Sequence, residues 1–244
     1  MTRKTVLGLL VLLAFVLVCI LISVPSKGQE ERSNPKTQRR QFDENRFPIA
    51  DYSAAEPTDP VQRAKRQAKG KKYDKSSWRV HPNSVSDSMV RVDSVDRNLP
   101  AFPFDNSSVV LVGQVSDAHA YLSNDKTGVY SVFTVQVNEI LKSSNSLTLS
   151  DGSVIEVIRD GGRVRFPNGR LHLYTIAEQD MPQVGLRYVL FLTKINIESD
   201  FEIITGYELR EGKVYPLDDL PKLNTYSNTD EAAFLRELRN KSKL

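Results

Sequence analysis

The sequence predicts a mainly β protein: a small closed or partly open β-barrel, preceded by a transmembrane helix and a disordered linker and followed by a short C-terminal helix. Three observations support this organisation. Residues 6–24 form an apolar run without a charge. Residues 25–104 contain eight prolines and few apolar runs, whereas residues 105–218 alternate short strand patterns with turn signals. Seven or so strands at such spacing are typical of a closed or nearly closed sheet.

The first segment, residues 6–24, is long enough to cross a bilayer. Its 19 residues follow a short basic tail, residues 1–5. As a helix it would span about 28 Å, close to the ~30 Å hydrocarbon core. A cleaved signal peptide is the alternative, but its apolar region is usually about 7–15 residues long. The length favours a retained signal anchor, as does Pro25, which makes Val24-Pro25-Ser26 a poor cleavage site. The lipid bilayer is therefore the first expected partner.

Charges on the two sides of this segment give conflicting orientations. Arg3 and Lys4 precede it, while five Lys or Arg lie within residues 27–40. Counting these cations places the body inside the cell. A very short basic tail before a first apolar segment is nevertheless how secretory signals begin. We therefore expect a single-pass membrane protein whose C-terminal domain lies outside the cytoplasm.

Residues 25–104 are expected to be a flexible basic linker, because so few apolar residues cannot offset the entropy of ordering the chain. Within this stretch, residues 61–72 can form a short helix with a weak apolar stripe, and residues 85–95 can add an edge strand or stay extended. Residues 25–82 carry a net charge of +6 and residues 83–244 a net charge of −5. Candidate membrane-surface residues within the linker are Arg63, Lys65, Arg66, Lys69, Lys71 and Lys72. Such a cluster can bind anionic head groups, can bind nucleic acid if the body lies inside the cell, or can simply be a solvated linker. The expected orientation argues against nucleic acid.

The body, residues 105–218, follows a strand-and-turn pattern throughout. The expected strands are 108–116, 129–141, 154–159, 163–166, 170–176, 188–192, 201–209 and 214–217. Residues 129–141 alternate with period two, which indicates one wetter face. Residues 188–192 are continuously apolar, as in a strand that is covered on both sides. Asn168-Gly169 between two alternating runs predicts a β-hairpin.

The C-terminal segment, residues 219–244, contains an amphipathic helix over 230–239. Asn228 or Thr229 can cap its first turn, and acidic and basic residues at its two ends match the helix dipole. We expect this helix to pack against the barrel or to plug one end of it. Binding of a partner is the alternative role.

Several motifs in the body resemble a recurring domain of uncharacterised bacterial exported or membrane-anchored proteins. They are Val112-Gly113-x-Val115, the run from Phe133 to Lys142, Val157 with Gly161-Gly162, and Gly185-x-x-Tyr188 followed by Val-Leu-Phe-Leu. The resemblance implies a five-stranded OB-like barrel, of the shape seen in netrin-like and metalloproteinase-inhibitor domains. These motifs are structural positions, and no catalytic residue comes with them. The cysteines of netrin-like domains are missing, so protease inhibition does not carry over.

The sequence predicts no cofactor, no metal site and no catalytic residue. One cysteine and three histidines exclude a Cys-rich zinc site. The most specific surface feature is the hairpin with Arg163, Arg165, Phe166 and Arg170, the predicted binding residues. Arg163 and Arg165 have the same parity and should project from one face, where guanidinium groups can hold a carboxylate or phosphate. A solvated hairpin with internally paired arginines is the alternative.

These observations favour a membrane-anchored, non-enzymatic binding or interaction module outside the cytoplasm. Its partner would be an anionic envelope polymer or a protein. A hydrolase with its site in the barrel mouth is the first alternative, and it requires His119 or His172 to converge with carboxylates. A structural spacer or assembly domain is the second, and it requires an exposed apolar patch in place of a polar cleft.

Overall fold

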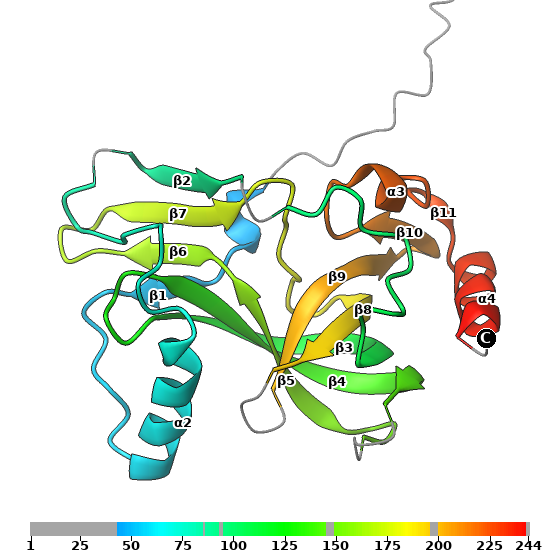
Figure 1. The fold of residues 1–244 in the computed structure, drawn as a ribbon, viewed down its shortest axis with the longest axis horizontal. Helices are drawn as coiled ribbons and strands as arrows, with labels where there is room; N and C mark the ends of the chain where they lie inside the picture. Colours follow the sequence, from blue (N-terminus) through cyan, green and yellow to red (C-terminus); the bar gives the residue numbers. More distant parts are fainter. Residues whose placement is uncertain (1–42, 85, 93–94, 145–148, 196–199, 243–244) are drawn as a thin grey trace, which may run out of the picture. The chain divides into compact units, whose positions relative to one another are not determined.

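The computed structural model describes residues 43–84, 86–92, 95–144, 149–195 and 200–242. Their helices and strands, in chain order, are η1 Glu44–Arg46, β1 Ile49–Asp51, α2 Pro60–Lys71, β2 Ser88–Arg91, β3 Val109–Leu122, β4 Val129–Ser143, β5 Val154–Asp160, β6 Gly162–Arg165, β7 Leu171–Ile176, β8 Arg187–Lys194, β9 Phe201–Arg210, β10 Lys213–Pro216, α3 Pro221–Asn224, β11 Thr229–Asp230 and α4 Glu231–Lys241 (Figure 1). No helix in this part of the chain is long and apolar enough to cross a membrane. The predicted membrane segment, residues 6–24, and residues 25–42 of the predicted linker lie outside it.

The prediction of a mainly β fold is confirmed, and its centre is a closed ring of five strands. Around the ring the order is β3, β4, β5, β9, β8 and back to β3. Within the ring, β5 and β9 are the one pair that runs parallel, and the other pairs are antiparallel. Strands β10 and β11 extend the sheet beyond β9.

Alternating side chains of the ring strands supply two separate cores. One set forms a core that includes Val135, Val157 and Leu190 and also the N-terminal Phe47. The other set, including Val112 and Phe191, packs with α4 in a second core. Residues 188–192 are all fully buried, as a strand covered on both faces requires.

A second, four-stranded sheet has the order β1, β6, β7, β2. Its central hairpin is the one that Asn168-Gly169 predicts: Phe166 N–H donates to Arg170 O at 2.9 Å, and Gly169 has a φ of +81°. Glycine tolerates this left-handed conformation because it has no Cβ. Both outer strands, β1 and β2, pair in parallel with the hairpin.

The expected flexible linker over 25–104 is wrong for its described part, which folds onto the body. It supplies η1, β1, α2 and β2. Phe47 is fully buried in the core with Val135 and Leu190, and Trp78 is 2% exposed in a third core with Val164 and Tyr174 from the second sheet. A few widely spaced apolar residues are enough to dock this region, because they pack against side chains of strands much later in the chain. Average composition does not reveal such pairings.

The C-terminal helix α4 spans Glu231–Lys241, close to the predicted 230–239. Its N-cap is Asp230, whose carboxylate accepts a hydrogen bond from Ala233 N–H at 2.9 Å, and not Asn228 or Thr229 as expected. Phe234 and Leu238 are buried in the core that α4 shares with the ring. The helix therefore covers the outside of the ring.

Candidate functional site

The predicted binding hairpin is the middle of the second sheet and does not form one site. Arg163 Nε donates to Phe47 O at 3.0 Å, and the Arg163 side chain also contacts Asn45. Phe166, expected to be a binding aromatic, is 2% exposed and packs against Tyr52. Strand β1 covers the edge of β6, so the expectation that this hairpin is freely exposed is wrong for Arg163 and Phe166.

The remaining two hairpin arginines stay on the surface but are set apart. Arg165 shares the outer face of β6 with Arg163, as its parity predicts, and is exposed. Arg170 pairs with Asp87 at 2.5 Å and so matches the alternative of an internally paired arginine. A site made of all four residues is not assembled.

The predicted membrane-surface cluster lies on and beside α2, where three of its six cations contact carboxylates of the body and two contact residues just before the helix. The contacts are Lys65 and Lys69 to Glu156 at 2.9 and 2.6 Å, Lys69 to Asp200 at 3.1 Å, Lys72 to Glu202 at 2.7 Å, Arg66 to Glu56, and Arg63 Nε to Pro57 O at 2.8 Å. Lys71 is exposed. The basic helix thus pairs with the acidic body, which leaves it poorly suited to hold lipid head groups.

Lys69 is the buried centre of this docking. Burial opposes ionisation of Glu156, but hydrogen bonds from Lys69 and Lys65 outweigh it and hold the Glu156 pKa below its usual value. Burial raises the pKa of Asp200, and the nearby Lys69 offsets only part of that effect. These shifts report a structural ion-pair cluster that fixes α2 on β5 and β9.

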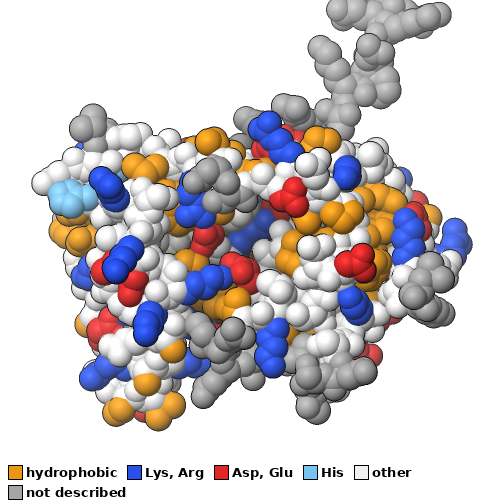
Figure 2. All heavy atoms as spheres, viewed as in Figure 1, with side chains coloured by type: hydrophobic (Ala, Val, Ile, Leu, Met, Phe, Trp, Pro, Cys, Tyr) orange, Lys and Arg blue, Asp and Glu red, His pale blue; other side chains and the backbone are white. Residues whose placement is uncertain are grey.

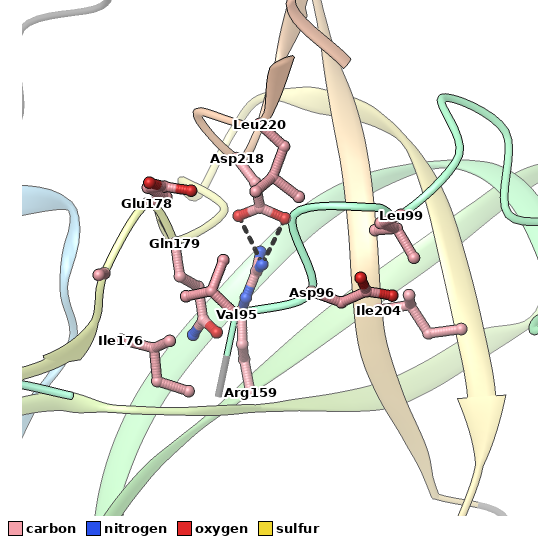
Figure 3. A pocket seen from close by; sticks show the side chains of 11 residues that line it. Val95, Asp96, Leu99, Arg159, Ile176, Glu178, Gln179, Ile204, Asp218 and Leu220 are labelled. Carbon is pink, nitrogen blue, oxygen red and sulfur yellow. Dashed lines mark hydrogen bonds and ion pairs between the residues drawn. The ribbon is translucent and has the colours of Figure 1, made fainter. Parts of the chain in front are cut away.

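A polar cleft of about 200 Å³ lies between the second sheet and the ring. Residues that line it are Val95, Asp96, Leu99, Arg159, Ile176, Ala177, Glu178, Gln179, Ile204, Asp218 and Leu220 (Figure 3). They come from β5, β9, the end of β7 and the turn after it, and the segments around residues 95–99 and 218–220. In Figure 2 the face drawn is hollowed near its middle, with Lys or Arg side chains inside the hollow and acidic side chains at its edge.

Arg159, at the end of β5, rises through the middle of the cleft toward Asp218 (Figure 3). Its Nη2 donates to both carboxylate oxygens of Asp218, at 2.6 and 2.7 Å. Asp218 also accepts hydrogen bonds from Thr205 Oγ1 at 2.7 Å and Asp180 N–H at 3.2 Å. Arg159 is only 3% exposed, and its Nε and Nη1 are buried with no hydrogen-bond partner in the described structure. Three N–H donors of this guanidinium are therefore unused.

Glu178 supplies the matching acceptor at the rim. Its Oε1 accepts from Arg97 Nη2 at 2.6 Å, whereas its Oε2 is buried without a hydrogen-bond partner in the described residues. The turn after β7 holds Glu178 at a φ of +62°, a conformation that costs a non-glycine residue about 1–2 kcal/mol. This strained residue beside an unsatisfied arginine marks the cleft as a candidate site.

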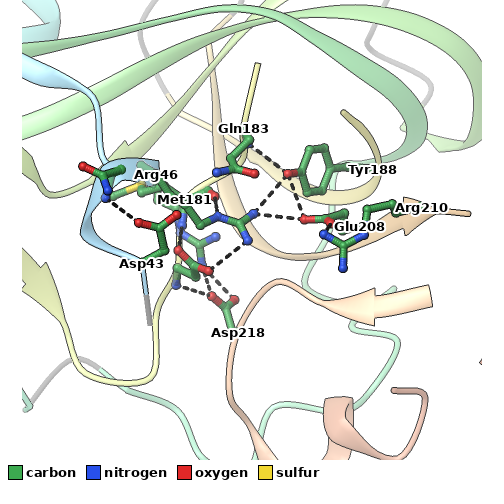
Figure 4. A network of polar contacts seen from close by, with 11 residues as sticks. Asp43, Arg46, Met181, Gln183, Tyr188, Glu208, Arg210 and Asp218 are labelled. Atoms are coloured by element: carbon green, nitrogen blue, oxygen red, sulfur yellow. Dashed lines mark hydrogen bonds and ion pairs between the residues drawn. The ribbon is translucent and has the colours of Figure 1, made fainter. Parts of the chain in front are cut away.

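A network of buried charges continues from Asp218 away from the cleft (Figure 4). Arg46 is 6% exposed and lies 3.4 Å from Asp180 and 3.0 Å from Glu208. It also donates to Tyr188 Oη at 3.2 Å. The network ties the N-terminal residues 43–47 to β8, β9 and the connection before β8. Its role is structural, and it fixes the backbone on which Asp218 stands.

A larger groove of about 560 Å³ lies beside this network, lined by Asn45, Arg46, Phe47, Pro48, Ile49, Ala118, Arg163, Pro182, Gln183, Val184 and Leu186. Its two cations already have protein partners: Arg46 contacts Glu208, and Arg163 contacts Phe47 O. The groove therefore offers less unsatisfied hydrogen bonding than the cleft.

The described residues do not assemble the site that the hydrolase alternative requires. His81 and His119 are exposed, and His119 contacts Asp117 at 2.9 Å on the surface of β3. His172 is 1% exposed, packs edge-on against Phe166, and has a pKa lowered by burial. None of the three lines the cleft or the groove. The same part of the chain contains no cluster of three or more His, Cys, Asp or Glu that could hold a metal ion.

Comparison with known proteins gives this chain no relatives: no family model matches it, and no curated protein matches it. The resemblance to exported bacterial domains stays a prediction from the motifs. The function must therefore be argued from the geometry of the cleft.

Proposed function

We propose that this chain is a non-enzymatic binding module, carried at a membrane outside the cytoplasm, whose ligand occupies the cleft at Arg159. The five-stranded ring supports an OB-like barrel as its scaffold, since an OB-fold is a five-stranded barrel used for binding. Partner, location and barrel type are parts of this proposal.

The unsatisfied guanidinium of Arg159 carries the proposal. A buried polar group without a partner costs about 1–3 kcal/mol, and native proteins contain few of them. The pair with Asp218 uses one nitrogen and leaves Nε and Nη1 buried beside an open cleft. A ligand oxygen would satisfy these donors. Hydroxyl, thiol and imidazole groups do not line the cleft in the described structure, and two of its three carboxylates, those of Asp218 and Glu178, are paired with arginines. This lining favours binding over nucleophilic catalysis.

Membrane attachment is supported by residues 6–24, the apolar run that the sequence analysis assigns to an anchor. The folded body begins by residue 43, so 18 residues (25–42) separate it from the anchor. At about 3.5 Å per residue these span at most ~60 Å in any conformation. A partner at or near the envelope surface is therefore part of the proposal.

Two measurements test this proposal. A library of small polar compounds is titrated into the full chain while the methyl signals of Ile176 and Ile204, which line the cleft, are followed by NMR. We expect some compounds to shift both methyls in the native protein and not in Arg159→Lys, which keeps a charge for Asp218 but loses the unused donors. If no compound moves these methyls, the cleft is not a binding site. A reporter enzyme active only outside the cytoplasm, fused after Leu244, tests the location.

A further inference from the structure

We infer that the ligand of the cleft is a segment of polypeptide that inserts one peptide group and an adjacent aliphatic side chain. This inference rests on the proposed function and specifies its ligand. Of the two partners that the sequence favours, an anionic envelope polymer and a protein, this ligand selects the protein.

The charges that line or flank the cleft disfavour an anionic ligand. The positive charge of Arg159 is already matched by Asp218, and that of Arg97 by Glu178. Asp96 adds a further negative charge, so these five side chains sum to −1. A carboxylate or phosphate entering here would meet like charge and would have to be desolvated as well. A neutral polar ligand meets neither cost.

The unused hydrogen-bonding atoms require a ligand that both accepts and donates. Arg159 Nε and Nη1 can only donate, whereas Glu178 Oε2 can only accept when the carboxylate is ionised. A peptide group carries one strong acceptor and one strong donor, and it is neutral. A single peptide unit therefore supplies both kinds of group that the cleft lacks.

The rest of the lining selects a peptide over a sugar, which also offers donors and acceptors. Five aliphatic side chains line the cleft and no aromatic ring does: Val95, Leu99, Ile176, Ile204 and Leu220. Such a surface gains most from burying another aliphatic group. The volume of about 200 Å³ corresponds to roughly seven water molecules at ~30 Å³ each, which suits one side chain with its peptide group.

The test titrates the full chain with N-acetyl-leucine N-methylamide, a neutral compound with two amide groups and one aliphatic side chain. Sodium acetate, sodium phosphate and N-acetylglucosamine are titrated in parallel. Binding is followed at the methyl signals of Ile176 and Ile204 and at the Arg159 Nε–H signal. A ligand of this size is expected to bind with a Kd of about 1 mM. The other three compounds should leave these signals unchanged over the same concentrations.

Two variants and one control connect binding to the atoms named. Glu178→Gln should weaken binding about tenfold, because an amide has a single acceptor oxygen: while that oxygen stays on Arg97, an NH2 group replaces Oε2 and cannot accept from the ligand. Arg159→Lys should weaken it at least as much. Arg165→Gln, which changes an exposed arginine outside the cleft, should leave the Kd unchanged.

Each outcome decides between the two proposals. Binding of the leucine amide with the stated variant effects supports both. Binding of acetate, phosphate or the sugar without the amide overturns the peptide inference and leaves the cleft as a binding site. Binding of the amide that Glu178→Gln and Arg159→Lys leave unchanged overturns the inference as well. If the methyl signals of Ile176 and Ile204 respond neither to these four compounds nor to any compound of the library, the proposed function fails as well.

Discussion

Replacing Arg46 by methionine should reduce the free energy of unfolding by about 3 kcal/mol at neutral pH. Arg46 is buried between Glu208 at 3.0 Å and Asp180 at 3.4 Å, and it donates to Met181 O at 3.2 Å. Removing one partner of a buried ion pair costs about 3–5 kcal/mol, because the other charge stays buried. Arg210 lies 3.3 Å from Glu208 and compensates part of the loss, which places the effect at the low end of that range.

The assay is urea unfolding of the full chain in mild detergent, with the midpoint and slope fitted for the native protein and the variant. The slope should stay the same, so the loss appears as a lower midpoint. Arg63→Gln is the matched control. Arg63 belongs to the same N-terminal region but is exposed, and its side chain donates to the backbone oxygens of Pro57 and Thr58 just before α2, so we expect a change below about 0.5 kcal/mol.

A loss below about 1 kcal/mol for Arg46→Met would refute the reasoning. It would mean that residues 43–47 do not lock onto β8 and β9 through the buried network, and that this segment behaves as the tether that its composition suggests.

Three further predictions concern the contacts between the folded N-terminal region, the second sheet and the ring. Trp78→Ala should lower the free energy of unfolding by about 3–5 kcal/mol, because Trp78 is 2% exposed in a core. A negligible change in the urea midpoint would mean that the segment around Trp78 behaves as a flexible linker. Gly161→Ala should lower the free energy of unfolding by at least 1 kcal/mol more than Gly152→Ala. Both glycines have a positive φ, but a Cβ at Gly161 would lie 2.8 Å from Tyr174 O, whereas a Cβ at Gly152 would have nothing within 4 Å. Equal midpoints for the two variants would contradict this. Burial raises the pKa of Asp160 above 3.8, so its ionisation lowers the free energy of unfolding as pH rises from about 4 through the folded-state pKa. When unfolding is measured against pH, Asp160→Asn should lack this loss of stability. A pH profile that the substitution leaves unchanged would contradict the prediction.

The strands of the body were predictable because their signals are local. The apolar run at 188–192 predicts burial on both faces, and the turn at Asn168-Gly169 predicts the hairpin, and both are present. A buried strand needs consecutive apolar residues, and a tight turn needs a glycine with positive φ. Signals of this kind lie within a few neighbouring residues.

The packing of the described residues between 43 and 104 onto the body, and the cleft, could not be predicted, because both depend on partners distant in the sequence. Phe47 and Trp78 are isolated apolar residues in a basic, proline-containing stretch, and their packing partners lie on strands of the body. Arg159 lies near the end of β5, and its partner Asp218 is 59 residues away in the sequence. No spacing rule connects such a pair before the fold is known.

The most direct test of the cleft as a peptide-binding site is a set of intermolecular NOEs between the full chain and N-acetyl-leucine N-methylamide. We predict NOEs from the leucine methyls of the probe to Ile176 and Ile204 in the cleft. NOEs confined to Ile49 and Val184 of the larger groove, or their absence at every aliphatic residue of the cleft under saturating probe, would contradict the account.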